Sequence, residues 1–232
     1  GAVTIIAARG EDKLAEAVKE IRRLIKDKGA KEAQVFSYSV DIADEKGCAD
    51  FVRTLHEQHG GVDFLINNAG RSIRRAIESS YDRFHDFERT MALNYFGSLR
   101  ITMGLLPGMV ARKKGHVVNL SSISVLVNAP RFSAYVASKA ALDAWTRCAS
   151  SEFADQGITF TTVNMPLVRT PMTAPTKIYD SMPLLKPEEA ADMIVQACVE
   201  KPVRVATRLG TGGALLHTAV PRVTLIIMNT TF

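Results

Sequence analysis

Hydrophobic and polar positions along this chain alternate between two kinds of segment. Short runs of mostly apolar and β-branched residues predict buried strands, whereas longer stretches with apolar residues every three or four positions predict amphipathic helices. The predicted strands are Val3–Ala8, Gln34–Val40, Val62–Ile66, His116–Leu120, Ile158–Asn164 and Val203–Thr207. The predicted helices are Glu11–Lys28, Glu45–His59, Tyr81–Arg112, Ala134–Gln156 and Pro187–Glu200.

Strands that alternate with helices imply parallel pairing, with helices covering both faces of the sheet. The pattern therefore predicts an α/β fold: a doubly wound parallel sheet in three αβα layers, with its ligand site beyond the carboxyl ends of the strands. No repeat or linker divides the 232 residues, so we expect a single domain over residues 1–232.

Two segments lie outside this alternation. Residues 166–187 contain five prolines, which is typical of a long binding loop rather than a short connection, and we interpret them as a substrate loop. The tail, residues 209–232, is apolar and contains three glycines. Three interpretations of this tail remain open: a partner surface, a helix on a membrane surface, or part of the core.

Charge and cysteine content narrow the function classes. The formal net charge of +5 suits a phosphate-bearing cofactor or substrate, and no arginine-rich run is interleaved with aromatic residues, so we expect no nucleic-acid binding. The three cysteines form no Cys-x-x-Cys pair, which favours free thiols in a reducing compartment and a cytoplasmic location. His56 and His59 have no third ligand nearby in sequence, so no metal site is expected.

The clearest chemical signal is Tyr135 followed four residues later by Lys139, with Ser122 thirteen positions before the tyrosine. The first two lie one helical turn apart, and Ser122 follows a predicted strand at the edge where an open sheet binds its ligand. Carbonyl reduction requires a proton donor, and a nearby ammonium is expected to lower the pKa of the phenol. Ser122 can donate a hydrogen bond to an oxygen that gains negative charge.

With these residues in register, the chain resembles the short-chain dehydrogenase/reductase family, of Rossmann-like fold, from residue 1 to about residue 207. The sequence Asn67-Asn68-Ala69-Gly70 matches the family motif beside the cofactor, and Val40-Asp41-Ile42 matches the segment that meets the adenine. Asn94 matches the helix asparagine that supports a proton-relay water. The resemblance implies a catalytic tetrad of Asn94, Ser122, Tyr135 and Lys139, in which Tyr135 is the general acid and Lys139 also binds the nicotinamide ribose.

The sequence departs from the family pattern in two places. The Gly-rich phosphate loop and the strand before it are absent, so we expect this sequence to begin within a longer fold. After the strand that ends at Asn164, the family usually has Asn-Pro-Gly-x-Val-x-Thr. Here Pro166 replaces the glycine, whereas Val168 and Thr170 keep their places; a nicotinamide contact by Pro166, Val168 and Thr170 is still expected.

The cofactor is expected to be NADP(H). Family members that prefer NAD carry an acidic residue at the end of the second strand, but here Ala8 and then Arg9 follow. A guanidinium suits a 2′-phosphate, so Arg9 joins Asp41, Ile42, Asn68, Ala69 and Gly70 in the expected cofactor site.

Substrate and assembly are predicted from resemblance alone. Residues 163–179 and 205–210 are most similar to the reductase module of bacterial fatty acyl-CoA reductases, which implies an apolar carbonyl substrate, a fatty aldehyde or acyl thioester. Arg71, Arg74 and Arg75 could attract an anionic substrate. The alternatives are a hydroxysteroid, 3-oxoacyl or polyol dehydrogenase, or a non-catalytic cofactor-binding module. The resemblance also implies a homodimer or homotetramer built on the helices Tyr81–Arg112 and Ala134–Gln156, with Leu142 and Trp145 in the interface.

Overall fold

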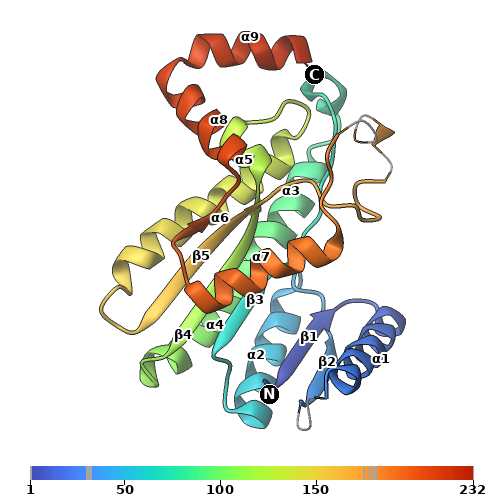
Figure 1. Cartoon of the computed structure of the whole chain (residues 1–232), viewed down its shortest axis with the longest axis vertical. Coiled ribbons are helices and arrows are strands. Elements are labelled where there is room, and N and C mark those ends of the chain that lie inside the picture. Colours follow the sequence, from blue (N-terminus) through green and yellow to red (C-terminus); the bar gives the residue numbers. More distant parts are fainter. Residues whose placement is uncertain (1, 30–32, 175, 178, 180–181, 232) are drawn as a thin grey trace.

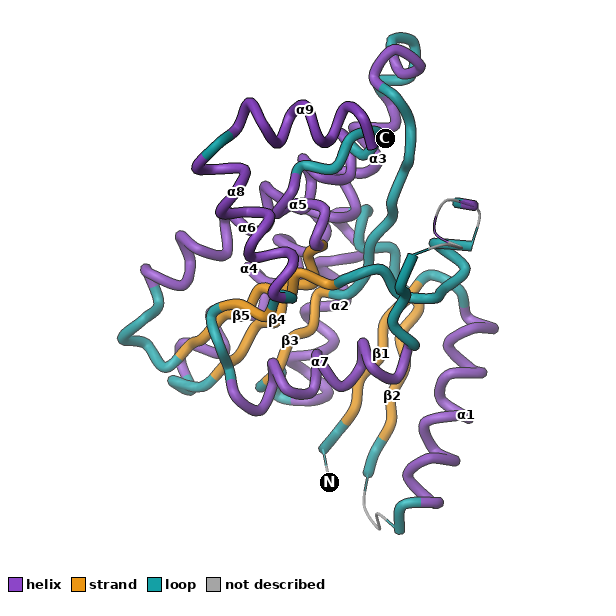
Figure 2. The backbone as a smooth tube through the Cα atoms, turned by 45° about the horizontal axis from the view of Figure 1, so that its top comes forward, coloured by secondary structure: helices purple, strands orange, loops and turns teal. Residues whose placement is uncertain are grey.

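The computed structural model describes residues 2–29, 33–174, 176–177, 179 and 182–231. All strand pairs are parallel, as predicted, but the strands form two sheets rather than one. β1 (Thr4–Ala8) pairs with β2 (Val35–Ser39). A second sheet has the order β3, β4, β5, β6, with bounds Phe64–Asn67, Gly115–Ser122, Ile158–Met165 and Arg204–Val205. Figure 2 shows β1 and β2 beside the first helix, apart from β3, β4 and β5.

The helices follow the predicted order with some differences. They are α1 (Glu11–Asp27), α2 (Glu45–His59), η1 (Ile77–Ser80), α3 (His85–Met91), η2 (Ala92–Gly97), α4 (Ser98–Ala111), α5 (Ile123–Val127), α6 (Ser133–Glu152), α7 (Pro187–Glu200), α8 (Arg208–Ala219) and α9 (Pro221–Thr231). The predicted helix Tyr81–Arg112 begins later, at His85, and contains the π-helical turn η2. Helices α5, α8 and α9 were not predicted as separate elements, since α5 is too short to show a period and α8 contains several glycines.

The core lies on both faces of the larger sheet because successive strand residues point in opposite directions. On one face, Val117 of β4 and Phe160 of β5 pack against α4 and α6. On the other face, Val118 and Val163 pack against Ala197 of α7. Figure 1 shows α6 and α7 on opposite sides of β4 and β5, which is the predicted three-layer arrangement.

The interface prediction is wrong for Leu142 and stays a prediction for Trp145. Leu142 is only 1% exposed and belongs to the core of its own chain. Trp145 is partly buried and packs edge-on against Phe160, with ring centroids 6.0 Å apart. Both residues therefore stabilise α6 on the sheet, and Leu142 is not available to a second copy. The exposed apolar side chains on the neighbouring helical segment are Phe96 and Met103.

A cleft of about 1280 Å³ separates the two sheets. Strands β1 and β3 line its two sides, and the β3 side chains Phe64 and Ile66 are 47% and 43% exposed. The carboxyl ends of both strands open into this cleft, so it reaches the edge where the ligand site was predicted. Within the described part of the chain, no helix is both long enough and apolar enough to cross a membrane.

Candidate active site

Ser122 is the last residue of β4 and the N-cap of α5. Its hydroxyl oxygen accepts a hydrogen bond from the backbone N–H of Ser124 at 3.1 Å and a second from the Ser124 hydroxyl at 2.9 Å. With both acceptor positions of Ser122 used in this way, its own hydrogen is left to be donated. Ser124 therefore orients the proton of Ser122, a role that sequence reasoning missed because Ser124 belongs to no motif.

Tyr135 and Lys139 lie on the first turns of α6, on the side that faces the end of β4. The Lys139 ammonium is buried and donates a hydrogen bond to the backbone carbonyl of Leu120 at 2.7 Å. The Tyr135 phenol interacts with the Ser122 hydroxyl. The structure thus brings Ser122, Tyr135 and Lys139 together, although up to seventeen positions separate them in the sequence.

The pKa shifts differ in part from the prediction. Burial raises the pKa of the Tyr135 phenol, and the hydrogen bond with Ser122 lowers it by less, so the net shift is upward. Burial lowers the pKa of Lys139 to about 8. The expectation that Lys139 depresses the tyrosine pKa is therefore wrong for this structure: removal from water, which disfavours the phenolate, is the largest effect. Ser122 is the group that favours the phenolate.

Asn94 lies in the π-helical turn η2 and is fully buried. Its carboxamide nitrogen donates to the backbone carbonyl of Arg71 at 2.9 Å and to the Ser138 hydroxyl at 2.9 Å. Its carboxamide oxygen accepts from the backbone N–H of Arg71 at 2.8 Å. The side chain thus joins the loop after β3 to α6 and holds the two together rather than pointing into solvent. Single π turns inside helices are frequent at functional sites.

A network of polar side chains from β5, β6 and α6 holds the backbone of Ser122. Asn164 of β5 donates to the backbone carbonyl of Ser122 at 3.2 Å, and Arg204 of β6 donates to the Asn164 carboxamide oxygen. The same guanidinium contacts both oxygens of Asp143 on α6, at 2.8 and 3.0 Å. Asp143 lies one turn after Lys139, so the network links α6, which carries Tyr135 and Lys139, to the end of β4. No local sequence signal connects Arg204 with Asp143.

The residues expected to bind the cofactor fall into two groups. Arg9, Asp41, Ile42, Asn68, Ala69 and Gly70 all line the cleft between the two sheets. Pro166, Val168 and Thr170 follow the end of β5, where Val168 forms a bridge with Leu185. Part of the proline-rich loop lies outside the described residues.

Gly70 lies where the cleft comes close to Asn94 and Lys139. A Cβ atom at Gly70 would lie 3.2 Å from the Asn94 carboxamide oxygen and 3.4 Å from the Lys139 ammonium nitrogen. The lack of a Cβ at Gly70 therefore lets the Asn94 and Lys139 side chains lie close to this loop. At the other side of the cleft, Arg9 lies 3.7 Å from Asp41 and is largely exposed. Arg9 lines this cleft, and the Lys139 ammonium lies behind Gly70, which lines its other part. A guanidinium and a nearby ammonium fit a phosphate-bearing cofactor with a ribose near Lys139.

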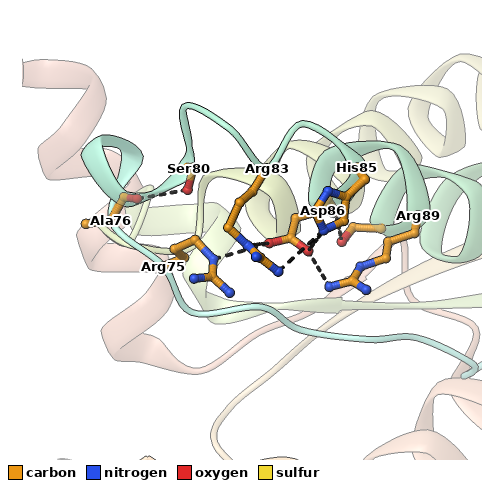
Figure 3. Close-up of polar contacts among 8 residues, drawn as sticks. Arg75, Ala76, Ser80, Arg83, His85, Asp86 and Arg89 are labelled. Atoms are coloured by element: carbon orange, nitrogen blue, oxygen red, sulfur yellow. Dashed lines mark hydrogen bonds and ion pairs between the residues drawn. The ribbon is translucent and has the colours of Figure 1, made fainter.

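The loop between β3 and α3, which carries Arg71, Arg74 and Arg75, is anchored by a buried carboxylate (Figure 3). The Asp86 side chain is 3% exposed and contacts Arg75 at 3.2 Å and Arg83 at 3.3 Å, as well as Arg89. Burial raises the pKa of Asp86, but Arg83, Arg89 and His85 together lower it more, so the net shift is downward. Arg75 is therefore structural, whereas Arg71 and Arg74 have no ion-pair partner among the described residues.

The sequence also contains three cysteines and a pair of histidines on α2. Cys48, Cys148 and Cys198 are free thiols, as predicted. His56 contacts the backbone carbonyl of Gly104, and His59 contacts the Tyr38 hydroxyl. Among the residues that the structure describes, no cluster of three potential metal ligands exists.

The sequence of this chain is similar to those of known proteins. A family model for short-chain dehydrogenases matches residues 1–179. The chain belongs to the short-chain dehydrogenase family. It is 50% identical over its full length to a fatty acyl-CoA reductase of Acinetobacter baylyi and covers 76% of that protein. Family membership makes the chain an oxidoreductase of the kind that uses NAD(H) or NADP(H) and acts on a small molecule.

Two solved structures extend the comparison. A short-chain dehydrogenase from Streptomyces avermitilis is 25% identical with a TM-score of 0.74, over 99% of this chain and 97% of the other. The L-sorbose reductase of Gluconobacter frateurii, solved with NADPH and L-sorbose, has a TM-score of 0.75 at 24% identity, over 87% of this chain and 81% of that one. At that identity the second match shows the shared fold.

Proposed function

We propose that this chain is the catalytic part of an NADPH-dependent reductase that acts on an apolar carbonyl, a fatty aldehyde or an acyl thioester. The observation that carries the proposal is the meeting of Ser122, Tyr135 and Lys139 at the end of β4. The substrate class follows from the full-length similarity to the Acinetobacter fatty acyl-CoA reductase.

The side chains divide the chemistry as follows. The substrate carbonyl oxygen lies within reach of Ser122 and Tyr135, and bound NADPH supplies the hydride. Ser122, oriented by Ser124, donates a hydrogen bond to the oxygen as negative charge develops there. Tyr135 gives that oxygen its proton, since the phenol, whose pKa lies above its ordinary value, is protonated at neutral pH. Lys139 holds the cofactor ribose beside Gly70.

The preference for NADPH rests on Arg9. Its guanidinium is 66% exposed and lines the cleft, while its contact with Asp41 at 3.7 Å is long for an ion pair. We expect at least a tenfold preference for NADPH over NADH, about 1.4 kcal/mol. The Arg9→Ala variant should raise the KM for NADPH and leave that for NADH nearly unchanged. Equal kcat/KM for both cofactors in the unchanged protein would contradict the assignment.

The direct test measures NADPH consumption by the full-length protein with a panel of carbonyl compounds. We expect turnover with long-chain aldehydes or acyl-CoA, and at least about a hundredfold lower kcat/KM with a ketosteroid, a 3-oxoacyl thioester or a ketose. A reversed order would assign the chain to one of these other substrate classes. NADPH binding without turnover of any of them would favour the non-catalytic module.

We also propose a homodimer or homotetramer. Phe96 in η2 and Met103 in α4 are 47% and 57% exposed on the helical segment that carries Asn94, and an apolar face of this kind is suited to a twofold interface. Light scattering on the full-length protein should give a multiple of the monomer mass. The Phe96→Asp variant should shift the mass to that of the monomer, whereas Phe84→Asp, at another exposed site, should leave it unchanged.

A further inference from the structure

The last two helices form an apolar projection at the end of the molecule that holds the catalytic residues. Figure 1 shows α8 and α9 beyond α5, at the end of the sheet where β4 reaches Ser122. We call α8 and α9 together the C-terminal hairpin. Its large exposed side chains, between 40% and 81% accessible, include Leu209, Leu215, Leu216, Val223, Leu225 and Ile226.

The way α8 packs explains why its leucines face outward. A Cβ at Gly210 would lie 3.0 Å from atoms of Ile123 and Leu126, and one at Gly213 would lie 2.7 Å from Val127. The glycines therefore form the face of α8 that lies against α5, which leaves Leu209 and Leu215 on the surface. In α9, Thr224 is the buried contact, through hydrogen bonds to Pro221 and His217. Neither helix uses these large side chains to build the core.

The charged side chains in and just before the C-terminal hairpin are all basic. The sequence from Lys201 to Phe232 contains no aspartate or glutamate, but it contains Lys201, Arg204, Arg208 and Arg222. Arg204 is used by Asp143, whereas Arg208 and Arg222 are exposed and have no ion-pair partner among the residues the structure describes. Apolar side chains flanked by unpaired arginines are characteristic of helices that lie in the interface of an anionic membrane.

We propose that the C-terminal hairpin docks on an anionic phospholipid surface. The leucines and isoleucine enter the acyl boundary, and Arg208 and Arg222 contact lipid phosphates. The hairpin packs on α5, which begins at Ser122, so docking would place the open edge of the sheet close to the membrane, where apolar substrates dissolve. The surface itself does not depend on the proposed reaction, and binding is measured without turnover.

The experiment is co-sedimentation of the full-length, cofactor-free protein with vesicles of phosphatidylcholine, with or without a third of phosphatidylglycerol. We expect binding to the anionic vesicles that weakens with salt. The double variant Leu225→Ser/Ile226→Ser should reduce the partition coefficient at least about tenfold. Arg222→Glu should reduce it on anionic vesicles and leave the weak binding to neutral vesicles unchanged. The matched control, Val199→Ser on α7, removes a side chain that is 74% exposed elsewhere and should change neither.

Two results would overturn the proposal. Absence of vesicle binding would mean that another part of the protein covers the hairpin, and a double variant that becomes monomeric with unchanged vesicle binding would assign the hairpin to a second copy of the chain. Activity on a short, water-soluble aldehyde serves as the separate check. It should be the same in the double variant and the unchanged protein, so a failure of membrane docking is distinguishable from a failure of the proposed reaction.

Discussion

The buried ammonium of Lys139 makes a specific prediction about stability. Lys139 is 3% exposed, and burial lowers its pKa from 10.5 to about 8. The unfolded chain keeps the ordinary pKa, so below about pH 8 the charged lysine opposes folding by roughly 3 kcal/mol, at about 1.36 kcal/mol per pKa unit. Between the two pKa values the unfolded chain binds a proton that the folded chain lacks, so this contribution makes stability rise with pH. Above both values the penalty is gone.

The Lys139→Met variant removes the charge and keeps the length of the side chain. It also loses the hydrogen bond to the Leu120 carbonyl, which costs about 1–3 kcal/mol. At about pH 7 the free energy of unfolding should therefore stay level or rise by up to about 2 kcal/mol, although the site has lost its ammonium. At about pH 10, where most of the penalty is gone, the variant should be as stable as the unchanged protein or less stable by up to about 2 kcal/mol. The change in this difference between the two pH values, about 2–3 kcal/mol, does not depend on the hydrogen bond.

The assay is urea unfolding of the cofactor-free, full-length protein, followed by the fluorescence of Trp145, the one tryptophan in this sequence, which packs against Phe160. Lys19→Met on α1 is the control, because Lys19 is exposed and its charge is not removed from water on folding. If Lys139→Met and the unchanged protein show the same pH dependence of stability, the ammonium is not buried as the structure has it.

The remaining predictions concern the proton donor, its neighbour and the loop anchor. Tyr135→Phe should lower kcat by roughly 10²–10⁴ and leave the NADPH dissociation constant nearly unchanged, and retention of most activity would place the proton source elsewhere. Ser124→Ala removes one of the two hydrogen bonds that orient Ser122 and should lower kcat about fivefold at constant cofactor affinity. Ser124→Thr, which keeps the hydroxyl, should restore the rate. An unchanged kcat in Ser124→Ala would mean that Ser122 needs no orienting partner. Asp86→Ala leaves the partly exposed Arg75 and Arg83 and the exposed Arg89 without their shared carboxylate and should lower the free energy of unfolding by about 1–3 kcal/mol, against less than about 0.5 kcal/mol for the exposed Asp82→Ala. Equal effects of the two aspartate variants would contradict the anchoring role.

The sequence by itself determined the order of elements and the candidate catalytic residues, because both depend on short-range regularities. Helix α2 has the predicted bounds since its ends are set locally, by the Asp44 side chain that accepts from Gly47 and by Gly60 in the left-handed region. Pro187 fixes the start of α7 in the same way. Tyr135 and Lys139 share a helix face at a spacing of four, and Ser122 ends a strand, so their meeting follows from element type alone.

The tertiary structure decided the features that depend on distant parts of the chain. Helix α8 forms despite glycines that disfavour helix locally, because Gly210 and Gly213 allow it to pack closely on α5. The upward shift of the Tyr135 pKa depends on how much water the whole fold excludes from the phenol, which no local pattern records. Arg204 meets Asp143 across sixty-one positions of sequence, and side-chain contacts at that separation exist only once the strands and helices have packed.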